Sequence, residues 1–181
     1  MLQIILPALE MWDESKEEFV QIKEQTLQLE HSLVSLSKWE SKWCKPFLTA
    51  DTKTYEESID YIKCMTLTQN VKEETYARIT TAHMKQIDEY IAAPMTATTF
   101  NEKNTVGKRS SEFTTSELIY YWMVALNIPF ECQKWHLNRL ITLIKVCNIK
   151  NQPPKKMSRK ETYSRNAALN KARRQRLNTN G

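Results

Sequence analysis

The spacing of apolar residues changes from a strand-like to a helix-like period within the first third of the chain. Residues 2–6 form a short apolar run that stops at Pro7, and residues 18–29 alternate in part between apolar and polar. Such runs predict two short strands that pair into a small sheet near the N-terminus. The glutamate- and lysine-rich residues around the second run are equally compatible with a helix, and the pattern leaves that alternative open.

From Ser32 onward, apolar residues recur every three or four positions, which predicts a succession of amphipathic helices. The predicted helices cover residues 32–43, a segment after Thr54, and residues 71–79, 81–93, 118–128, 130–149 and 158–177. Thr54 with Glu57, and Ser158 with Glu161, have the spacing of a capping box at a helix start. Residues 95–100 are rich in β-branched side chains and predict a strand, whereas residues 101–113 predict a loop.

These elements define a mostly helical α+β fold with a small N-terminal β element, a helical body and a basic C-terminal helix. Gln152 is followed by two prolines, and a residue before proline is disfavoured in the helical conformation, so a hinge is predicted there. We therefore expect a globular, mostly helical domain over residues 1–152 and a helical arm over residues 153–181.

The distribution of charged residues also changes at the boundary between residues 152 and 153. Residues 1–152 carry 17 basic and 20 acidic side chains, whereas the arm carries nine basic residues and one glutamate. The basic residues of the arm are Lys155, Lys156, Arg159, Lys160, Arg165, Lys171, Arg173, Arg174 and Arg176. This arm indicates an anionic partner. The alternative is a solvated C-terminal tail that frays, as charged termini commonly do. A protein surface is favoured over nucleic acid, because Tyr163 is the only aromatic residue available for base stacking and the domain itself is net acidic.

Composition excludes several classes of protein. Gly107 and Gly181 are the only glycines, so neither glycine-rich phosphate-binding motif can be written. No apolar run is long enough to cross a membrane, and the first residues lack the basic region of a secretory signal. The four cysteines are widely spaced, and we expect them to be reduced and mostly buried in a cytosolic protein.

No set of residues predicts catalysis, a cofactor or a metal site. Cys132 and His136 lie four positions apart, but zinc needs three or four ligands and no further candidate has a suitable spacing. His31 is interpreted as part of the cap of the helix that follows it. We therefore expect a protein that is not an enzyme.

The densest aromatic stretch lies between residues 120 and 135. It contains Tyr120, Tyr121, Trp122, Phe130 and Trp135. The simpler interpretation is that these side chains form the core of the domain. The alternative is an exposed groove that accepts an apolar helix of a partner. The two interpretations differ in the burial of these residues.

Several blocks of sequence resemble those of one phage protein family. They are residues 29–47 (LEHSLVSLSKWESKWCKPF), 95–98 (MTAT), 117–132 (ELIYYWMVALNIPFEC) with 135–140 (WHLNRL), and 151–158 (NQPPKKMS). Together they resemble the tail assembly chaperones of siphophages, and the similarity extends over residues 19–176. The blocks are distinctive as sequence but are not catalytic motifs.

The resemblance implies a non-enzymatic protein that acts in the host cell cytoplasm during phage assembly. Such chaperones are thought to coat the tape measure protein, keep it soluble and recruit tail-tube subunits, and they are absent from the finished virion. The aromatic stretch and the basic arm would then bind these partners. The sequence leaves open whether the protein also forms a homo-oligomer. The rival expectation is a structural virion protein of the neck or tail, anchored by its arm to a neighbouring subunit. A DNA-binding accessory protein is a third and weaker expectation.

Overall fold

The computed structural model describes residues 1–13, 17–49, 52–100, 113–152 and 158–179. Contacts within the chain divide it into two units, residues 1–148 and residues 149–181. The expected fold class is confirmed, since the described part is mostly helical with antiparallel strands near its N-terminus.

The strands form one antiparallel ribbon over residues 2–29. β1 (Leu2–Leu6) pairs with β4 (Gln25–Leu29), and β2 (Leu9–Asp13) pairs with β3 (Glu18–Ile22). The register is the same in the two ladders. From the pair Leu6↔Gln25 to the pair Leu9↔Ile22, residue numbers rise by three on one side of the ribbon and fall by three on the other. The predicted strands are thus confirmed, and β2, which the sequence pattern did not indicate, is the partner of β3.

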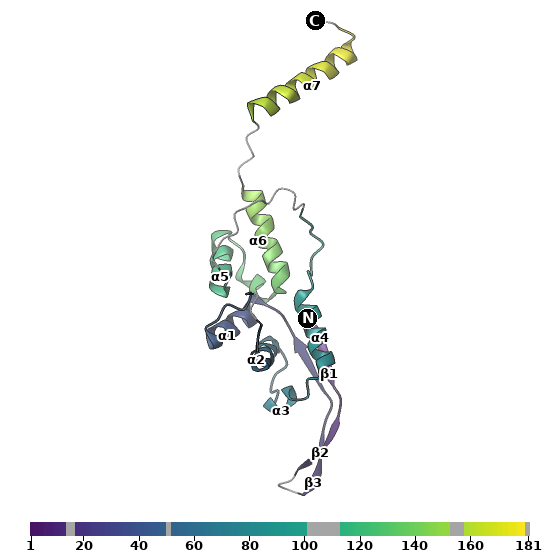
Figure 1. Ribbon diagram of the computed structural model, residues 1–181, viewed down its shortest axis with the longest axis vertical. Coiled ribbons are helices and arrows are strands. Elements are labelled where there is room, and N and C mark those ends of the chain that lie inside the picture. The colour runs from purple at the N-terminus through teal and green to yellow at the C-terminus, as the bar shows by residue number, and fades with distance from the viewer. Residues whose placement is uncertain (14–16, 50–51, 101–112, 153–157, 180–181) are drawn as a thin grey trace. The chain divides into compact units, whose positions relative to one another are not determined.

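The two halves of the ribbon have different surroundings. In the β1–β4 half, alternate residues point into the core, and Ile4, Leu6, Leu27 and Leu29 are buried. The β2–β3 half, which we call the hairpin, keeps large side chains at the surface and lies beyond the helices that flank β1 and β4 (Figure 1). The same period of two therefore produces a core strand pair at one end and an uncovered strand pair at the other.

Four helices follow the ribbon: α1 (Leu33–Trp43), α2 (Tyr55–Met65), α3 (Glu73–Tyr76) and α4 (Thr81–Ala92). Ser32, Thr54 and Thr80 cap α1, α2 and α4 through capping boxes, and each accepts a hydrogen bond from a backbone N–H of the first turn. α1 and α2 pack together, and the indole of Trp39 donates a hydrogen bond to the carbonyl oxygen of Glu57 at 2.9 Å. The helices predicted over residues 32–43, after Thr54 and over residues 81–93 are confirmed, whereas of residues 71–79 only Glu73–Tyr76 is helical.

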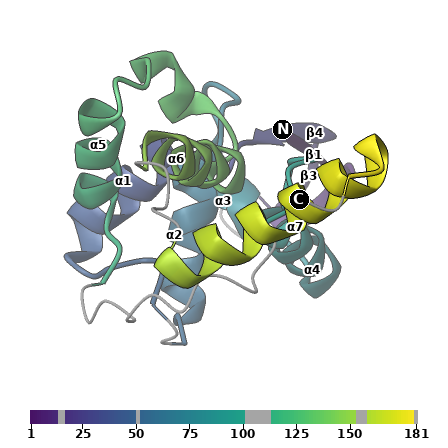
Figure 2. The same cartoon turned by 90° about the horizontal axis from the view of Figure 1, so that it is seen from above.

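α5 (Ser116–Ala125), the short 3₁₀ helix η2 (Phe130–Lys134) and α6 (Leu137–Asn151) complete the helical body. Seen from the side and from above, α5 and α4 lie on opposite sides of α6 (Figures 1 and 2). The inner face of α6 is aliphatic, with Leu137, Leu140 and Ile144 buried. The core therefore combines residues of the β1–β4 ribbon with residues of α1, α2, α4, α5 and α6.

The single helix predicted over residues 130–149 is wrong in its first third. The chain leaves the helical conformation at Trp135, whose backbone is extended, and His136 forms an isolated β-bridge with Ser32. The N–H of Leu137 donates to the carbonyl oxygen of His31 at 2.7 Å. Pairing with the end of the ribbon thus replaces the helical hydrogen bonds that an amphipathic pattern alone predicts.

The strand predicted over residues 95–100 is also wrong. Met95 has a φ of 47°, in the left-handed region, and the N–H of Thr98 bonds to the hydroxyl of Thr96 at 3.1 Å. Because β-branched residues favour strands only where a partner strand is available, their presence here does not produce one. Of the loop predicted over residues 101–113, residues 101–112 lie outside the described part of the chain.

The unit at residues 149–181 contains the helix α7 (Arg159–Leu177). It begins as predicted, because the hydroxyl of Ser158 accepts from the N–H of Glu161 and the Glu161 carboxylate accepts from the N–H of Ser158. The helix ends at Asn178, which has a φ of 50° and so acts as a left-handed C-cap. No residue of α7 is buried.

Candidate protein-binding surface

One buried carboxylate fixes the start of α5. Glu40 of α1 is 7% exposed and accepts hydrogen bonds from the N–H of Phe47 at 2.8 Å and from the N–H of Ser116 at 2.7 Å. The first N–H groups of a helix have no partner within the helix, and a negative charge at that end is favourable. Glu40 therefore ties the first turn of α5 to α1 and to the loop after α1.

The aromatic stretch of residues 120–135 is not the core, and that interpretation is wrong. Tyr121 is 64% exposed and Phe130 is 55% exposed, while Tyr120, Trp122 and Trp135 are only partly buried. The buried aromatic side chains come from earlier helices and loops: Trp39, Phe47, Tyr61, Tyr76 and Tyr90. α5 turns Ile119 and Met123 fully inward, Tyr120 and Trp122 pack against the edge of the core, and Tyr121 points away from it.

The three partly buried aromatic side chains are held in place by neighbouring groups. The hydroxyl of Tyr120 donates to Oε1 of Gln133 at 2.9 Å. The guanidinium of Arg139 lies 4.2 Å from the centre of the Trp135 ring, which is the geometry of a cation–π contact. These contacts connect α5 with η2 and η2 with α6.

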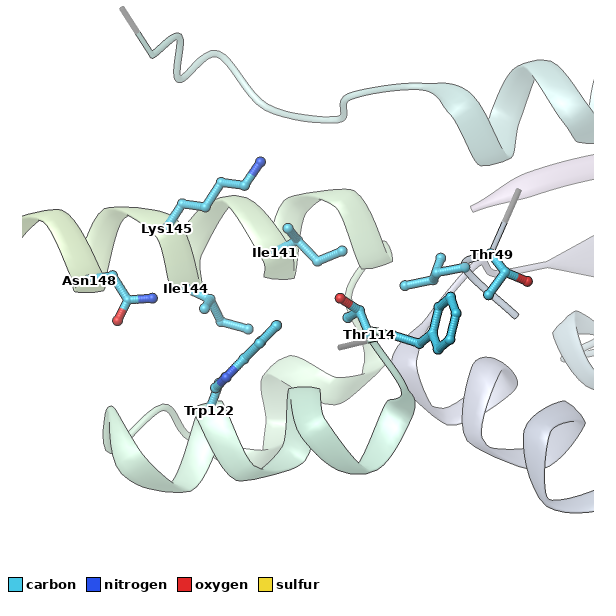
Figure 3. Close-up of a pocket in the computed structure, with 9 residues that line it drawn as sticks. Thr49, Thr114, Trp122, Ile141, Ile144, Lys145 and Asn148 are labelled. Carbon is cyan, nitrogen blue, oxygen red and sulfur yellow. The ribbon is translucent and has the colours of Figure 1, made fainter. Parts of the chain in front are cut away.

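Trp122 lies in a groove of about 550 Å³ between α5 and α6. Its ring points toward Ile144 of α6, and Ile141 lies along the same wall (Figure 3). The other residues that line the groove are Leu48, Thr49, Phe113, Thr114, Lys145 and Asn148. The groove is therefore mainly apolar, with Lys145 and Asn148 supplying polar groups from α6.

The outward face of α5 is exposed over its full length. Glu117, Tyr121, Val124 and Ala125 are spaced as one face of a helix, and all four are exposed. Tyr121 and Val124 are both more than half exposed, at 64% and 59%. An apolar pair at helical spacing on an uncovered face is typical of a surface that packs against another helix.

α7 presents charge on most sides. Its basic residues are Arg159, Lys160, Arg165, Lys171, Arg173, Arg174 and Arg176, against the single acid Glu161. Lys155 and Lys156, which the sequence analysis placed in the same binding set, lie outside the described residues. A helix that is polar all round does not bury a face of its own, so α7 can offer its charge to an acidic partner.

A buried polar cluster was missed by sequence reasoning. His31 is 1% exposed, and its Nδ1 lies 2.6 Å from the hydroxyl of Tyr61. Its ring meets the ring of His136 with 5.1 Å between the centroids. His31 is thus a core residue and not part of the α1 cap, which Ser32 provides. The two histidines are far apart in the sequence, so no local pattern indicates their contact.

His136 uses both ring nitrogens within the fold. Nε2 lies 3.0 Å from the carbonyl oxygen of Tyr90 and therefore carries the proton, while Nδ1 lies 3.3 Å from the N–H of Asn138 and accepts from it. Burial lowers the pKa of His136, although the Tyr90 carbonyl acts in the opposite direction. For His31, burial and the neighbouring His136 lower the pKa to about 3. Both rings are accordingly neutral at pH 7.

The described residues offer few other groups that could bind a metal ion or react. They contain no group of three or more histidine, cysteine or acidic side chains that could hold a metal ion. Among the four free cysteines only Cys132 is buried, and Cys44 is exposed, so the expectation that most are buried is wrong. Within the part of the chain that the structure describes, no helix has the length and apolar character needed to cross a membrane.

Comparison of the chain with models of known protein families, with curated proteins and with solved structures finds no match. The candidate surface must therefore be interpreted from its own geometry. In the first unit the candidate surface consists of the exposed face of α5 and the groove beside Trp122. In the second unit the basic helix α7 is a separate candidate.

Proposed function

We propose that this chain is a non-enzymatic phage tail assembly chaperone that binds the tape measure protein and helps to recruit tail-tube subunits in the host cell cytoplasm. The resemblance of its sequence blocks to that family suggests the role. The structural observation that carries the proposal is the exposed face of α5, where Tyr121 and Val124 stay uncovered while Ile119 and Met123 are buried.

A tape measure protein has long apolar helical stripes that are exposed before the tail tube encloses them, and such stripes cause aggregation. A helix laid along α5 would cover Tyr121 and Val124, and the neighbouring groove can accept a larger side chain beside Trp122. This is the helix-on-helix mode of recognition, in which apolar residues three and four positions apart make the contacts.

The size of this surface predicts weak binding by a single copy. Burying an apolar side chain from full exposure contributes about 1.5–3 kcal/mol. Because Tyr121, Val124 and Phe130 are 55–64% exposed, the three together contribute roughly 3–5 kcal/mol. Association costs about 4–15 kcal/mol before any gain is seen. Stable coverage therefore requires several copies on one tape measure molecule, each raising the effective concentration of the next.

The basic helix α7 would add attraction to acidic segments of the tape measure protein or of the tube subunit. Attraction between exposed charges is screened by salt, so this contribution falls as ionic strength rises. Removing residues 153–181 should weaken solubilisation of the tape measure protein and leave nucleic-acid affinity unchanged. A DNA-binding accessory protein would instead lose salt-sensitive nucleic-acid binding with the same deletion.

Co-expression with the tape measure protein tests the surface. The variant Tyr121→Ser with Phe130→Ser should reduce the soluble fraction of the tape measure protein. Tyr55→Ser is the matched control, because Tyr55 on α2 is also 64% exposed but lies outside the surface. Equal solubilisation by both variants would exclude α5 as the binding face.

Peptide mass spectrometry of purified virions and of infected-cell lysate separates the two assembly roles. A chaperone is abundant in the lysate and missing from virions. A fixed number of copies per virion would instead identify a structural protein of the neck or tail, with α7 as its anchor.

A further inference from the structure

The excess negative charge of residues 1–152 is concentrated in the β2–β3 hairpin. Residues 9–22 contain five acidic residues and one lysine, whereas the rest of residues 1–152 contain 15 acidic and 16 basic residues. The hairpin thus carries a net charge of −4, and the rest of the domain is close to neutral. The described residues of the hairpin, 9–13 and 17–22, include four of those acids and no basic residue.

One face of the hairpin combines an aromatic pair with a carboxylate. Trp12 and Phe19 are paired across the strands, are 51% and 70% exposed, and meet edge-to-face with 5.0 Å between their ring centres. The next pair on the same face is Glu10 and Gln21, joined by a side-chain hydrogen bond of 2.8 Å. An aromatic ring beside a carboxylate suits a guanidinium, which stacks on the ring and pairs with the acid.

The base of the hairpin is held by Arg78. Its guanidinium donates to the carbonyl oxygen of Pro7 on one strand and, at 3.5 Å, to that of Lys23 on the other. These carbonyls lie where the ribbon ladder is interrupted between β1 and β2. A two-stranded hairpin is only marginally stable alone, so this clamp supports a strand pair whose aromatic face remains uncovered.

α7 has the complementary character. It carries five arginines and two lysines against one glutamate, a net charge of +6, and all of its residues are exposed. Among its residues, Tyr163 and Leu177 add apolar surface, at 81% and 66% exposed. An acidic and aromatic surface of the first unit is therefore matched by the only strongly basic helix of the chain's described part.

We propose that α7 of one copy of this chain binds the β2–β3 hairpin of a second copy, so that the protein associates with itself head to tail. Within residues 1–148, the hairpin and the last residues of α6 in this unit lie at opposite ends (Figure 1). α7 follows α6 in the chain, and its positive charge is complementary to the negative charge of the hairpin. This association goes beyond the proposed function and needs no other phage protein.

Sedimentation velocity of the full chain, freed of nucleic acid by nuclease treatment, tests the proposal. The weight-average mass should rise with protein concentration at low salt and return toward that of a monomer at about 1 M salt, where the Debye length is about 3 Å. Reversing two charges on the hairpin (Glu10→Lys with Glu17→Lys) or on the helix (Arg173→Glu with Arg174→Glu) should each raise the dissociation constant about tenfold or more. All four side chains are exposed, so these variants should fold.

The two reversed proteins should bind each other. A mixture pairs the acidic helix of one protein with the basic hairpin of the other, so mass should rise in the mixture although neither protein associates well alone. Asp88→Lys with Glu89→Lys is the matched control, because both residues are exposed on α4 and the change in net charge equals that of the hairpin variant. Circular dichroism verifies that each variant keeps its helices, and Glu10→Gln with Glu17→Gln replaces the hairpin variant if it does not.

Three outcomes would overturn the proposal. The first is a parent chain that stays monomeric at every concentration in low salt, which includes the case in which α7 binds the hairpin of its own chain. The second is self-association that neither reversal weakens. The third is a control variant that weakens it as much as the hairpin variant does.

Discussion

The two buried histidines predict that the folded protein loses stability at mildly acidic pH. In the unfolded chain His31 has an ordinary pKa of 6.5, whereas burial and the facing His136 lower its pKa to about 3 in the fold. Between these values the unfolded state binds a proton that the folded state does not, so stability falls as pH falls. From pH 8 to pH 5 this one site costs about 2 kcal/mol, because 1.5 units below pKa 6.5 correspond to 1.36 kcal/mol per unit.

His136 acts in the same direction, because its pKa is also lowered. The carboxylate of Asp60 does not interfere in this window. Burial would raise the pKa of Asp60, but hydrogen bonds from Lys42 and Trp43 outweigh it and hold the pKa below the usual 3.8. The contribution of Asp60 is therefore lost only at a pH below the window.

Urea unfolding at pH 8, 7, 6 and 5 measures the effect. We expect His31→Gln to remove about 2 kcal/mol of the pH dependence, since glutamine does not titrate and can still accept from Tyr61. His83→Gln is the matched control, because His83 is the N3 residue of the capping box of α4 and glutamine serves there equally well. A parent chain whose stability changes by less than about 0.5 kcal/mol across the window would refute the reasoning.

Three further substitutions test other contacts. Glu40→Gln should destabilise the fold by about 1–3 kcal/mol in urea unfolding, because one of the two N–H groups bound by Glu40 then faces an amide NH₂; an unchanged midpoint would show that the tie to α5 contributes little. Arg78→Ala should speed hydrogen exchange in β2 and β3 and leave the β1–β4 amides protected, whereas uniform exchange across the ribbon would contradict a local clamp. Ser158→Ala removes the cap of α7 at a cost of about 0.5–2 kcal/mol and should reduce the helical signal in circular dichroism, while Ser164→Ala in the middle of the same helix should not.

The elements that the sequence predicts well are those whose signals are local. Capping boxes at Thr54 and Ser158 mark the starts of α2 and α7, and apolar spacing alone places α1 and α4 within a residue or two. The short apolar run at β1 likewise pairs as expected. In each case the residues that form the signal also make the contacts.

The predictions that fail depend on contacts between distant residues. The break before α6 arises because residues 136 and 137 pair with residues 31 and 32, which no window around Trp135 contains. Large, apolar aromatic side chains favour the interpretation of residues 120–135 as the core, but the buried aromatic residues of α1 and α2 are Trp39 and Tyr61. Exposure of Tyr121 is therefore a result of packing, and only the structure reveals it. The five acidic residues between positions 10 and 18 can be read from the sequence, but their place on an exposed hairpin depends on the pairing of β2 with β3.

The place of α6 in the chain affects how the protein folds during synthesis. Leu137, Leu140 and Ile144 belong to the same buried cluster as residues of the ribbon and α1, yet they are among the last core residues to leave the ribosome. Until they emerge, the cluster that also contains Leu29, Leu33 and Leu36 is incomplete, so the nascent chain passes through a stage with exposed core surface. A ribosome-bound chain stopped before Leu137 should be cleaved readily by protease, and extension through α6 should protect it.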